Sequence, residues 1–265
     1  MPRNIKLVLA YDGTDFAGWQ VQPDQNTIQG ALAAAIERIT GEQVLPQGSG
    51  RTDAGVHAVA QVAAFQTESP IPAPNLVIAL NDTLPSAIRV IHAQEVAADF
   101  HPRASAKAKT YRYRIYRENI CPPFFARYVY HHPYPLDEAA MAEAARLVVG
   151  EHDFTSFAAA DPDRTRRIQE ANGDEEGPSN VRTIFSSEFR REGAELIYEV
   201  RGNGFLHHMV RNLVGTFLLI GKGSLSAAGI IPILESRNRS AAGPTAPAGG
   251  LYLVSVEYRS LSEHV

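Results

Sequence analysis

The sequence predicts an α+β protein with a largely antiparallel sheet flanked by helices. Two observations lead to this class. Segments with alternating apolar residues, typical of strands, come in neighbouring pairs, and segments with helical periodicity stand between them. The chain has 265 residues, 45% of them hydrophobic, which is enough to bury a substantial core in one large domain or two smaller ones.

The elements of the first half follow from local signals. Residues 4–11 alternate apolar side chains and predict a half-buried strand. Thr27–Thr40 carries its apolar residues on one helical face, and Gly41 predicts the end of that helix. The remaining patterns predict strands at 43–47 and 58–65, a helix at 75–81 and a strand at 87–96.

The second half begins with a strong strand at Lys107–Tyr116, with Tyr111, Tyr113 and Ile115 on one face and arginines on the other. Asp137 predicts the cap of a helix that runs to Val149 and ends at Gly150. We further expect strands at 181–190 and 195–201, a helix from Phe205 to Ile220 that stops at Gly221, a shorter helix at 225–234 and a last strand at 251–258.

Charge and cysteine content narrow the classes of function. The net charge of −4 argues against a uniformly polyanion-binding surface, yet basic residues cluster locally at Arg103, Lys107, Lys109, Arg112, Arg114 and Arg117 and again at Arg164, Arg166 and Arg167. A single cysteine, Cys121, excludes an intrachain disulfide and a multi-cysteine zinc site. No apolar run matches a signal peptide or a membrane span, so the expected compartment is the cytoplasm.

The octapeptide Gly50–His57 is the main candidate for chemistry. Its two glycines permit a tight turn or a close approach to a ligand. Asp53, beside Arg51, has the residue type of a nucleophile or base that a neighbouring cation keeps ionised. The residues equally fit a polar hairpin turn in which Asp53 bonds its own backbone, so the octapeptide alone leaves both interpretations open.

Three other kinds of site find little support. The glycines near Gly50 and Gly221 do not have the spacing of a dinucleotide or phosphate loop. His207 and His208, if adjacent on a helix, point about 100° apart and do not share one metal ion in the i, i+4 manner. On the same helix His207 and Arg211 would be i, i+4 neighbours, and a cation beside one histidine disfavours a metal site. A Ser-His-Asp hydrolase is the main alternative without RNA, although Ser49, Asp53 and His57 are too crowded to form a triad by themselves and no nucleophile elbow occurs.

Two distant residues are candidates to act with Asp53. Arg211 lies away from the centre of the apolar face formed by Phe205, Met209, Leu213 and Phe217, so its guanidinium is available to pair with a loop carboxylate or to remain solvated. Tyr111 fits either a packed core position or a platform on which a base stacks. Sequence chemistry does not decide between these alternatives.

Seven blocks in the same order resemble one family along the whole chain, that of tRNA pseudouridine synthase A (the TruA family). GRTDAGVHA at 50–58 is similar to its catalytic motif, and the YDG…GWQ pattern at 11–20 to its opening. The other blocks are DFHPR at 99–103, KTYRY at 109–113, DFTSF at 153–157, FLHHMVRN at 205–212 and GLYLV at 250–254.

The resemblance implies an isomerase that converts uridine to pseudouridine at positions 38, 39 and 40 of the tRNA anticodon arm, without cofactor or metal. Asp53 matches the catalytic aspartate, which attacks uracil C6 or ribose C1′, a choice left open. Arg211 matches the basic residue that pairs with this aspartate, and Tyr111 the tyrosine that stacks on the target base and assists loss of the C5 proton. Arg51 matches the arginine that admits the flipped base, and Leu251 a hydrophobic wall of the pocket.

The resemblance also implies a pseudouridine synthase fold, in which two similar domains join their sheets, and a homodimer that binds the tRNA anticodon stem-loop. We place an N-terminal domain with the catalytic aspartate at 1–104 and a C-terminal domain that completes the cleft at 105–265. The chain departs from the family at Ile168–Ser179, which resembles an acidic insertion. A catalytically silent tRNA-binding paralogue remains the alternative, disfavoured because Asp53, Tyr111 and Arg211 are all present.

Overall fold

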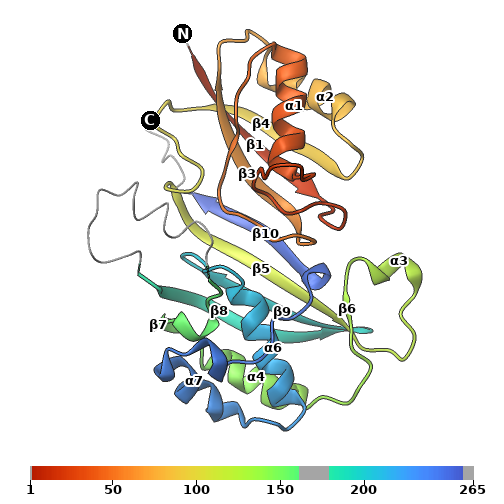
Figure 1. Cartoon of the computed structure of the whole chain (residues 1–265), viewed down its shortest axis with the longest axis vertical. Helices are drawn as coiled ribbons and strands as arrows, with labels where there is room; N and C mark the ends of the chain where they lie inside the picture. Colours follow the sequence, from red (N-terminus) through yellow and green to blue (C-terminus); the bar gives the residue numbers. More distant parts are fainter. Residues whose placement is uncertain (1, 161–178, 259–265) are drawn as a thin grey trace, which may run out of the picture. The chain divides into compact units, whose positions relative to one another are not determined.

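The computed structural model describes residues 2–160 and 179–258, so the predicted acidic insertion lies outside the described residues, apart from its last residue. Contacts divide the chain into two compact units. Unit 1 comprises Met1–Arg112, Pro122–Tyr130 and Ala248–Val265, and unit 2 comprises Tyr113–Cys121 and His131–Pro247. The predicted α+β class is confirmed, since each unit combines antiparallel strands with helices (Figure 1). The domain boundary at 104/105 stays a prediction.

The sheet of unit 1 has the strand order β4-β1-β3-β10, with a short strand β2 also paired to β3. These strands are β1 (Arg3–Tyr11), β2 (Gln47–Gly48), β3 (His57–Thr67), β4 (Ile88–Val96) and β10 (Leu251–Tyr258). All pairings are antiparallel except that of β10 with β3. Because β1 pairs along one edge of β3, β2 and β10 share the other edge: β2 at Ala63 and Ala64, β10 at His57 and Ala58.

Helices α1 (Ile28–Thr40) and α2 (Ala73–Thr83) contact each other and bury the apolar face of the sheet. The hydroxyl of Thr27 accepts a hydrogen bond from the backbone N–H of Gly30, and Gly41 ends α1 in the left-handed conformation. The expected strand at 43–47 is wrong except for its last residue, because only Gln47 and Gly48 pair with β3. Pro46 has no N–H for a strand ladder, and its carbonyl accepts from the Gln29 side chain at 2.9 Å. A four-residue helix, α3 (Pro123–Ala126), also belongs to unit 1.

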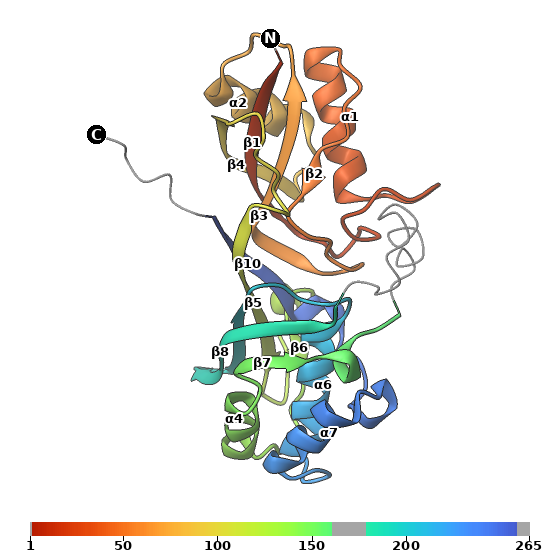
Figure 2. The same ribbon diagram turned by 90° about the vertical axis from the view of Figure 1, so that its left-hand side faces the viewer.

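Unit 2 contains the antiparallel strands β7 (Gly150–Asp153), β8 (Val181–Glu192) and β9 (Glu195–Gly202), with helices packed on them (Figure 2). Its helices are α4 (Glu138–Arg146), α6 (Met209–Gly221) and α7 (Ile230–Ser236). Strand β5 (Ala106–Tyr116) contributes residues to both units, as does the short β6 (Tyr130–His131). Single 3₁₀ turns occur at Thr155–Phe157, Ala227–Gly229, Arg239–Ala241 and Ala248–Gly250.

Three predicted helices of unit 2 have wrong bounds. The helix expected at 225–234 is a 3₁₀ turn at Ala227–Gly229 followed by α7, which starts at Ile230 and ends at Ser236. Asp137 caps α4 as expected, but the helix ends at Arg146, where the Leu147 N–H bonds the Ala144 carbonyl in a tighter turn. Gly150 then begins β7 instead of capping the helix. Helix α6 begins at Met209, because His208 adopts the left-handed conformation (φ 58°) and interrupts the pattern that starts at Phe205.

Helix α6 is the centre of the unit 2 core, and its residues Met209, Leu213 and Phe217 are fully buried as the periodicity predicts. Its middle lies directly against the segment before β10: a Cβ on Gly215 would lie 1.6 Å from the carbonyl oxygen of Pro244. Among the described residues no helix is long and apolar enough to cross a membrane.

We expect Gly215→Ala to lower the free energy of unfolding by about 3 kcal/mol or more, because backbone must move to make room for the methyl group. Urea unfolding measures the change. Gly229→Ala is the matched control: its Cβ would meet only the Ser226 hydroxyl oxygen at 3.5 Å, so its effect should stay within about 0.5 kcal/mol. Equal effects of the two changes would contradict the proposed close packing.

Candidate active site

Asp53 lies on the tight turn between β2 and β3, and its side chain is half-buried. The Val56 N–H donates to the Asp53 carbonyl at 3.1 Å, and Gly55 adopts the left-handed conformation (φ 76°). The hairpin-turn interpretation is therefore correct for the backbone. It leaves the carboxylate at the tip of a rigid turn.

The opening motif at residues 11–20 holds this turn from one side. The Trp19 N–H donates to the Thr52 carbonyl at 3.0 Å, and the Gly55 N–H donates to the Phe16 carbonyl at 3.3 Å. A Cβ on Gly18 would lie 2.7 Å from the Thr52 carbonyl oxygen, and one on Gly13 would lie 2.0 Å from that of Val56. Only glycine permits this backbone approach.

Tyr111, on β5, is buried in the same unit. Burial raises the pKa of the Tyr111 hydroxyl well above its usual value, and the nearby Tyr11 and Asp53 raise it further. Asp53 therefore lies near enough to Tyr111 to influence its pKa. At neutral pH the Tyr111 hydroxyl is protonated.

The other two predicted residues of unit 1 flank the same turn. Arg51 is exposed, two positions before Asp53. Leu251 is buried and begins β10, whose next residue, Tyr252, pairs with His57 at the end of the catalytic motif. Strand β10 therefore brings Leu251 to the end of the turn that carries Asp53.

Arg211 belongs to unit 2 and lies in the first turn of α6. Its Nε donates to the Ala246 carbonyl at 2.8 Å, and the Ala246 N–H donates to the Arg211 carbonyl at 3.1 Å. The half-buried guanidinium is thus fixed by a backbone pair within unit 2. The i, i+4 relation expected between His207 and Arg211 is wrong, because His207 precedes the helix.

The same correction applies to the argument about His207 and His208, which assumed that both residues lie on a helix. Their ring centroids lie 4.0 Å apart, and His207 Nδ1 lies 3.0 Å from the Ala160 carbonyl oxygen. As a donor to that carbonyl, Nδ1 carries a proton and is not a metal ligand.

His57 is a buried residue whose role the sequence does not reveal. Its Nδ1 accepts from the Gly13 N–H at 3.1 Å, its Nε2 lies 3.2 Å from the Arg127 carbonyl, and its ring stacks on Tyr252 at 4.8 Å. The pKa of His57 is lowered, chiefly by burial, which favours the neutral ring. The Ser49 hydroxyl donates to the Gln61 amide oxygen at 2.7 Å, so these contacts do not form a hydrolase triad.

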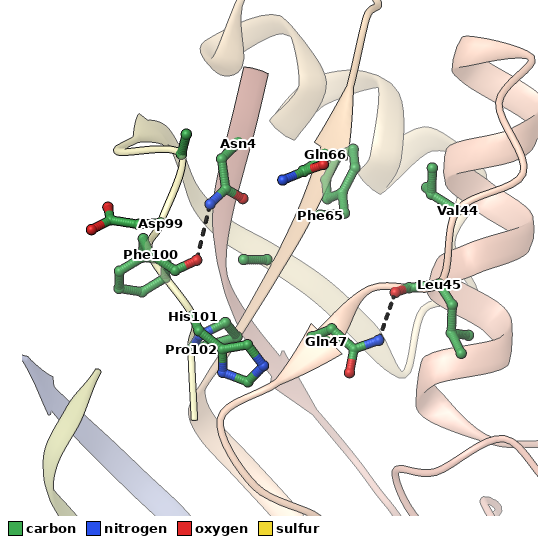
Figure 3. Close-up of a pocket in the computed structure, with 12 residues that line it drawn as sticks. Asn4, Val44, Leu45, Gln47, Phe65, Gln66, Asp99, Phe100, His101 and Pro102 are labelled. Atoms are coloured by element: carbon green, nitrogen blue, oxygen red, sulfur yellow. Dashed lines mark hydrogen bonds between the residues drawn. The ribbon is translucent and has the colours of Figure 1, made fainter. Parts of the chain in front are cut away.

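A groove elsewhere in unit 1 is lined by the DFHPR block. Figure 3 shows Asp99, Phe100, His101 and Pro102 on one side of it and Val44, Leu45 and Gln47 on the other. The Asn4 side chain donates to the Phe100 carbonyl at 3.0 Å, and Lys6 lies over the rings of Phe100 and Tyr258. This motif block is therefore anchored to the sheet, and none of the predicted site residues lines the groove.

The class of protein is shown by comparison with known families. The family model described as tRNA pseudouridine synthase matches residues 7–103 and 144–259, and the chain therefore belongs to that family. The matched residues include β1 from Leu7 onward, the turn with Asp53, helix α6 and strand β10.

More particularly, the chain is similar to proteins named tRNA pseudouridine synthase A. It is 55% identical over 256 residues to the one from Solibacter usitatus, covering 97% of this chain and 100% of that protein. Those from Moorella thermoacetica and Anoxybacillus flavithermus are 46% and 47% identical over 259 residues, covering 96% and 97% of this chain and 99% of each relative.

A substitution at Gly18 tests the close contact between the opening motif and the turn that carries Asp53. Gly18→Ala combines an unfavourable left-handed residue with a collision against Thr52, whereas Gly41→Ala, also left-handed, meets nothing within 4 Å. We expect a cost of about 1–2 kcal/mol for Gly41→Ala and a larger one for Gly18→Ala.

Hydrogen exchange locates the effect. Amide groups of residues 49–57 should exchange faster in Gly18→Ala than in Gly41→Ala, because the turn loses its backbone contacts with residues 16–19. Identical exchange of this segment in the two variants would refute the close-approach argument.

Proposed function

We propose that this chain isomerises uridine to pseudouridine in the anticodon arm of tRNA, at positions 38, 39 and 40, with Asp53 as the covalent catalyst. The observation that carries the proposal is the half-buried carboxylate on a turn held by backbone contacts, in a chain that belongs to the tRNA pseudouridine synthase family. The names of the relatives point to the same reaction.

The chemistry needs no redox partner, because substrate and product are isomers. In the proposed reaction a carboxylate oxygen of Asp53 bonds to uracil C6 or to ribose C1′, and the bond from N1 to C1′ breaks. The uracil turns, C5 bonds to C1′, and the carboxylate leaves. The C5 proton is lost to a base and N1 takes up a proton, so substrate and product have the same composition. Metal and cofactor have no assigned role in this proposal.

Tyr111 contributes as a neutral phenol. With its pKa raised, its phenolate is scarce at neutral pH, which favours stacking on the flipped base over direct removal of the C5 proton in the resting site. Stacking also offsets part of the few kcal/mol that extruding a base costs. Leu251 is proposed as an apolar wall that limits water, and Arg51 as the group that admits the base.

Arg211 is proposed as the cation that pairs with Asp53 during the reaction. This assignment rests on its match to the family motif and on the fixed orientation of its guanidinium within unit 2. A guanidinium is permanently charged and planar, which suits it to orient a carboxylate.

The proposed partner is the tRNA anticodon stem-loop, bound by a homodimer in the cytoplasm. Exposed basic residues such as Arg103 and Lys107 can neutralise phosphates, so tRNA affinity should fall with rising salt. A dimer would combine basic patches from two acidic chains into one RNA site, as the family resemblance implies. A silent paralogue is not supported, since the similar proteins carry the name of the synthase.

We expect Asp53→Asn to abolish pseudouridine formation, with a single-turnover rate at least about 1000-fold lower and tRNA binding largely kept, because the amide is not a nucleophile. Asp82→Asn, an exposed aspartate on α2, is the control and should react at the parent rate. Parent-like turnover by Asp53→Asn would disprove the mechanism. Mapping pseudouridines in tRNA from cells with and without the protein tests the target positions.

Arg211→Met should fold and slow the chemical step by about 100- to 1000-fold, the usual effect of removing one charged group that stabilises a reacting site. Arg191→Met, which removes an exposed ion pair with Glu138 in the same unit, should change the rate little. An unaltered single-turnover rate in Arg211→Met would refute the pairing with Asp53.

A further inference from the structure

Gln61 is a fully buried polar residue in the middle of β3, opposite Leu9 of β1. It lies in the stretch of β3 between the pairing with β2 and the pairing with β10, where the turn with Asp53 leaves the sheet. An amide buried at such a position is costly unless all its hydrogen bonds are made.

The Gln61 side-chain amide makes all four of its possible hydrogen bonds. Its Oε1 accepts from the Ser49 hydroxyl at 2.7 Å and from the Val62 N–H at 3.1 Å. Its Nε2 donates to the Gly50 carbonyl at 3.0 Å and to the Tyr11 hydroxyl at 3.4 Å. Because the Val62 N–H only donates and the Gly50 carbonyl only accepts, the orientation of the amide is unambiguous.

These partners reach the catalytic turn on both sides of Arg51. Ser49 and Gly50 come before it, and the Tyr11 hydroxyl continues to the Thr52 hydroxyl at 2.8 Å, directly before Asp53. Lys109 fastens the same end of the turn, because its ammonium donates to the Ser49 carbonyl at 2.6 Å. Ser49, Tyr11 and Thr52 are all buried, so water does not readily replace these bonds.

We propose that Gln61 is a positioning residue for the isomerisation: through Ser49, Gly50 and the Tyr11–Thr52 bond it holds the turn so that the Asp53 carboxylate meets its target atom. This inference rests on the proposed function. Displacing a nucleophile by about 1 Å lowers the rate on the order of 100-fold. We therefore expect loss of the Gln61 amide to slow the chemical step by that factor and to change tRNA binding little.

The first test is Gln61→Met, which keeps the length of the side chain and removes all four hydrogen bonds. We expect the single-turnover rate constant on saturating tRNA to fall about 100-fold, with the Kd for tRNA changed less than about threefold. A merely structural role would lower the fraction of active molecules, and hence the reaction amplitude, without changing the rate constant. Gln66→Met, on the exposed part of the same strand, is the control.

Two further variants keep the proposal falsifiable if Gln61→Met does not fold. Tyr11→Phe removes only the hydroxyl that links Gln61 to Thr52, and should slow the chemical step about 10-fold. Gln61→Glu keeps the shape but bonds the Gly50 carbonyl only when the acid is protonated. Its rate relative to the parent should therefore recover as pH is lowered, since burial raises the pKa of a carboxyl.

The outcomes separate this proposal from the proposed function. A parent protein that forms no pseudouridine in tRNA refutes the function itself. An active parent, with Gln61→Met or Tyr11→Phe reacting within about threefold of its rate constant, refutes the positioning role alone. The positioning role is also refuted if the ratio of the Gln61→Glu rate constant to the parent rate constant does not vary with pH.

Discussion

The backbone of residues 13–19 lies so close to the turn at residues 52–56 that no side chain fits between them, and the rest of the site depends on this contact. Glycine at positions 13 and 18 allows two backbone hydrogen bonds, which fix the turn without help from a ligand. This explains why the opening motif matters although it carries no proposed catalytic group. The backbone of this motif holds the turn that carries Asp53 from one side. The buried Gln61 amide on β3 holds the same turn through its hydrogen bond to the Gly50 carbonyl.

Burial governs the chemistry of the groups around this turn. Tyr111 and Tyr11 have raised pKa values, that of Tyr11 at about 12, and His57 has a lowered one, so each remains uncharged near neutrality. These three uncharged groups do not compete with the Asp53 carboxylate for the proposed role of nucleophile. Such an environment strengthens interactions made with a bound base, because little water competes for them.

Sequence reasoning succeeded where the deciding signal is local. The Gly41 stop of α1, the capping residue of α4 and the full extent of β10 follow from residues within each element. It failed where distant contacts decide: His208 leaves the helical pattern while the His207 carbonyl accepts from the Ala159 N–H, and the Pro46 carbonyl accepts from the Gln29 side chain instead of joining a strand ladder. Asp53 and Tyr111 are proposed from motifs in the sequence, whereas Gln61 resembles any strand residue until its four partners are known.

The parallel pairing of β10 with β3 joins residues from opposite ends of the chain. A ribosome releases the strand with His57 long before the strand with Tyr252, so the emerging segment carries Asp53 while the edge of β3 at His57 and Ala58 is still unpaired. Leu251, buried beside that pairing, is synthesised long after Asp53. A chain that ends before β10 therefore carries Asp53 but lacks the strand that pairs with the end of its turn.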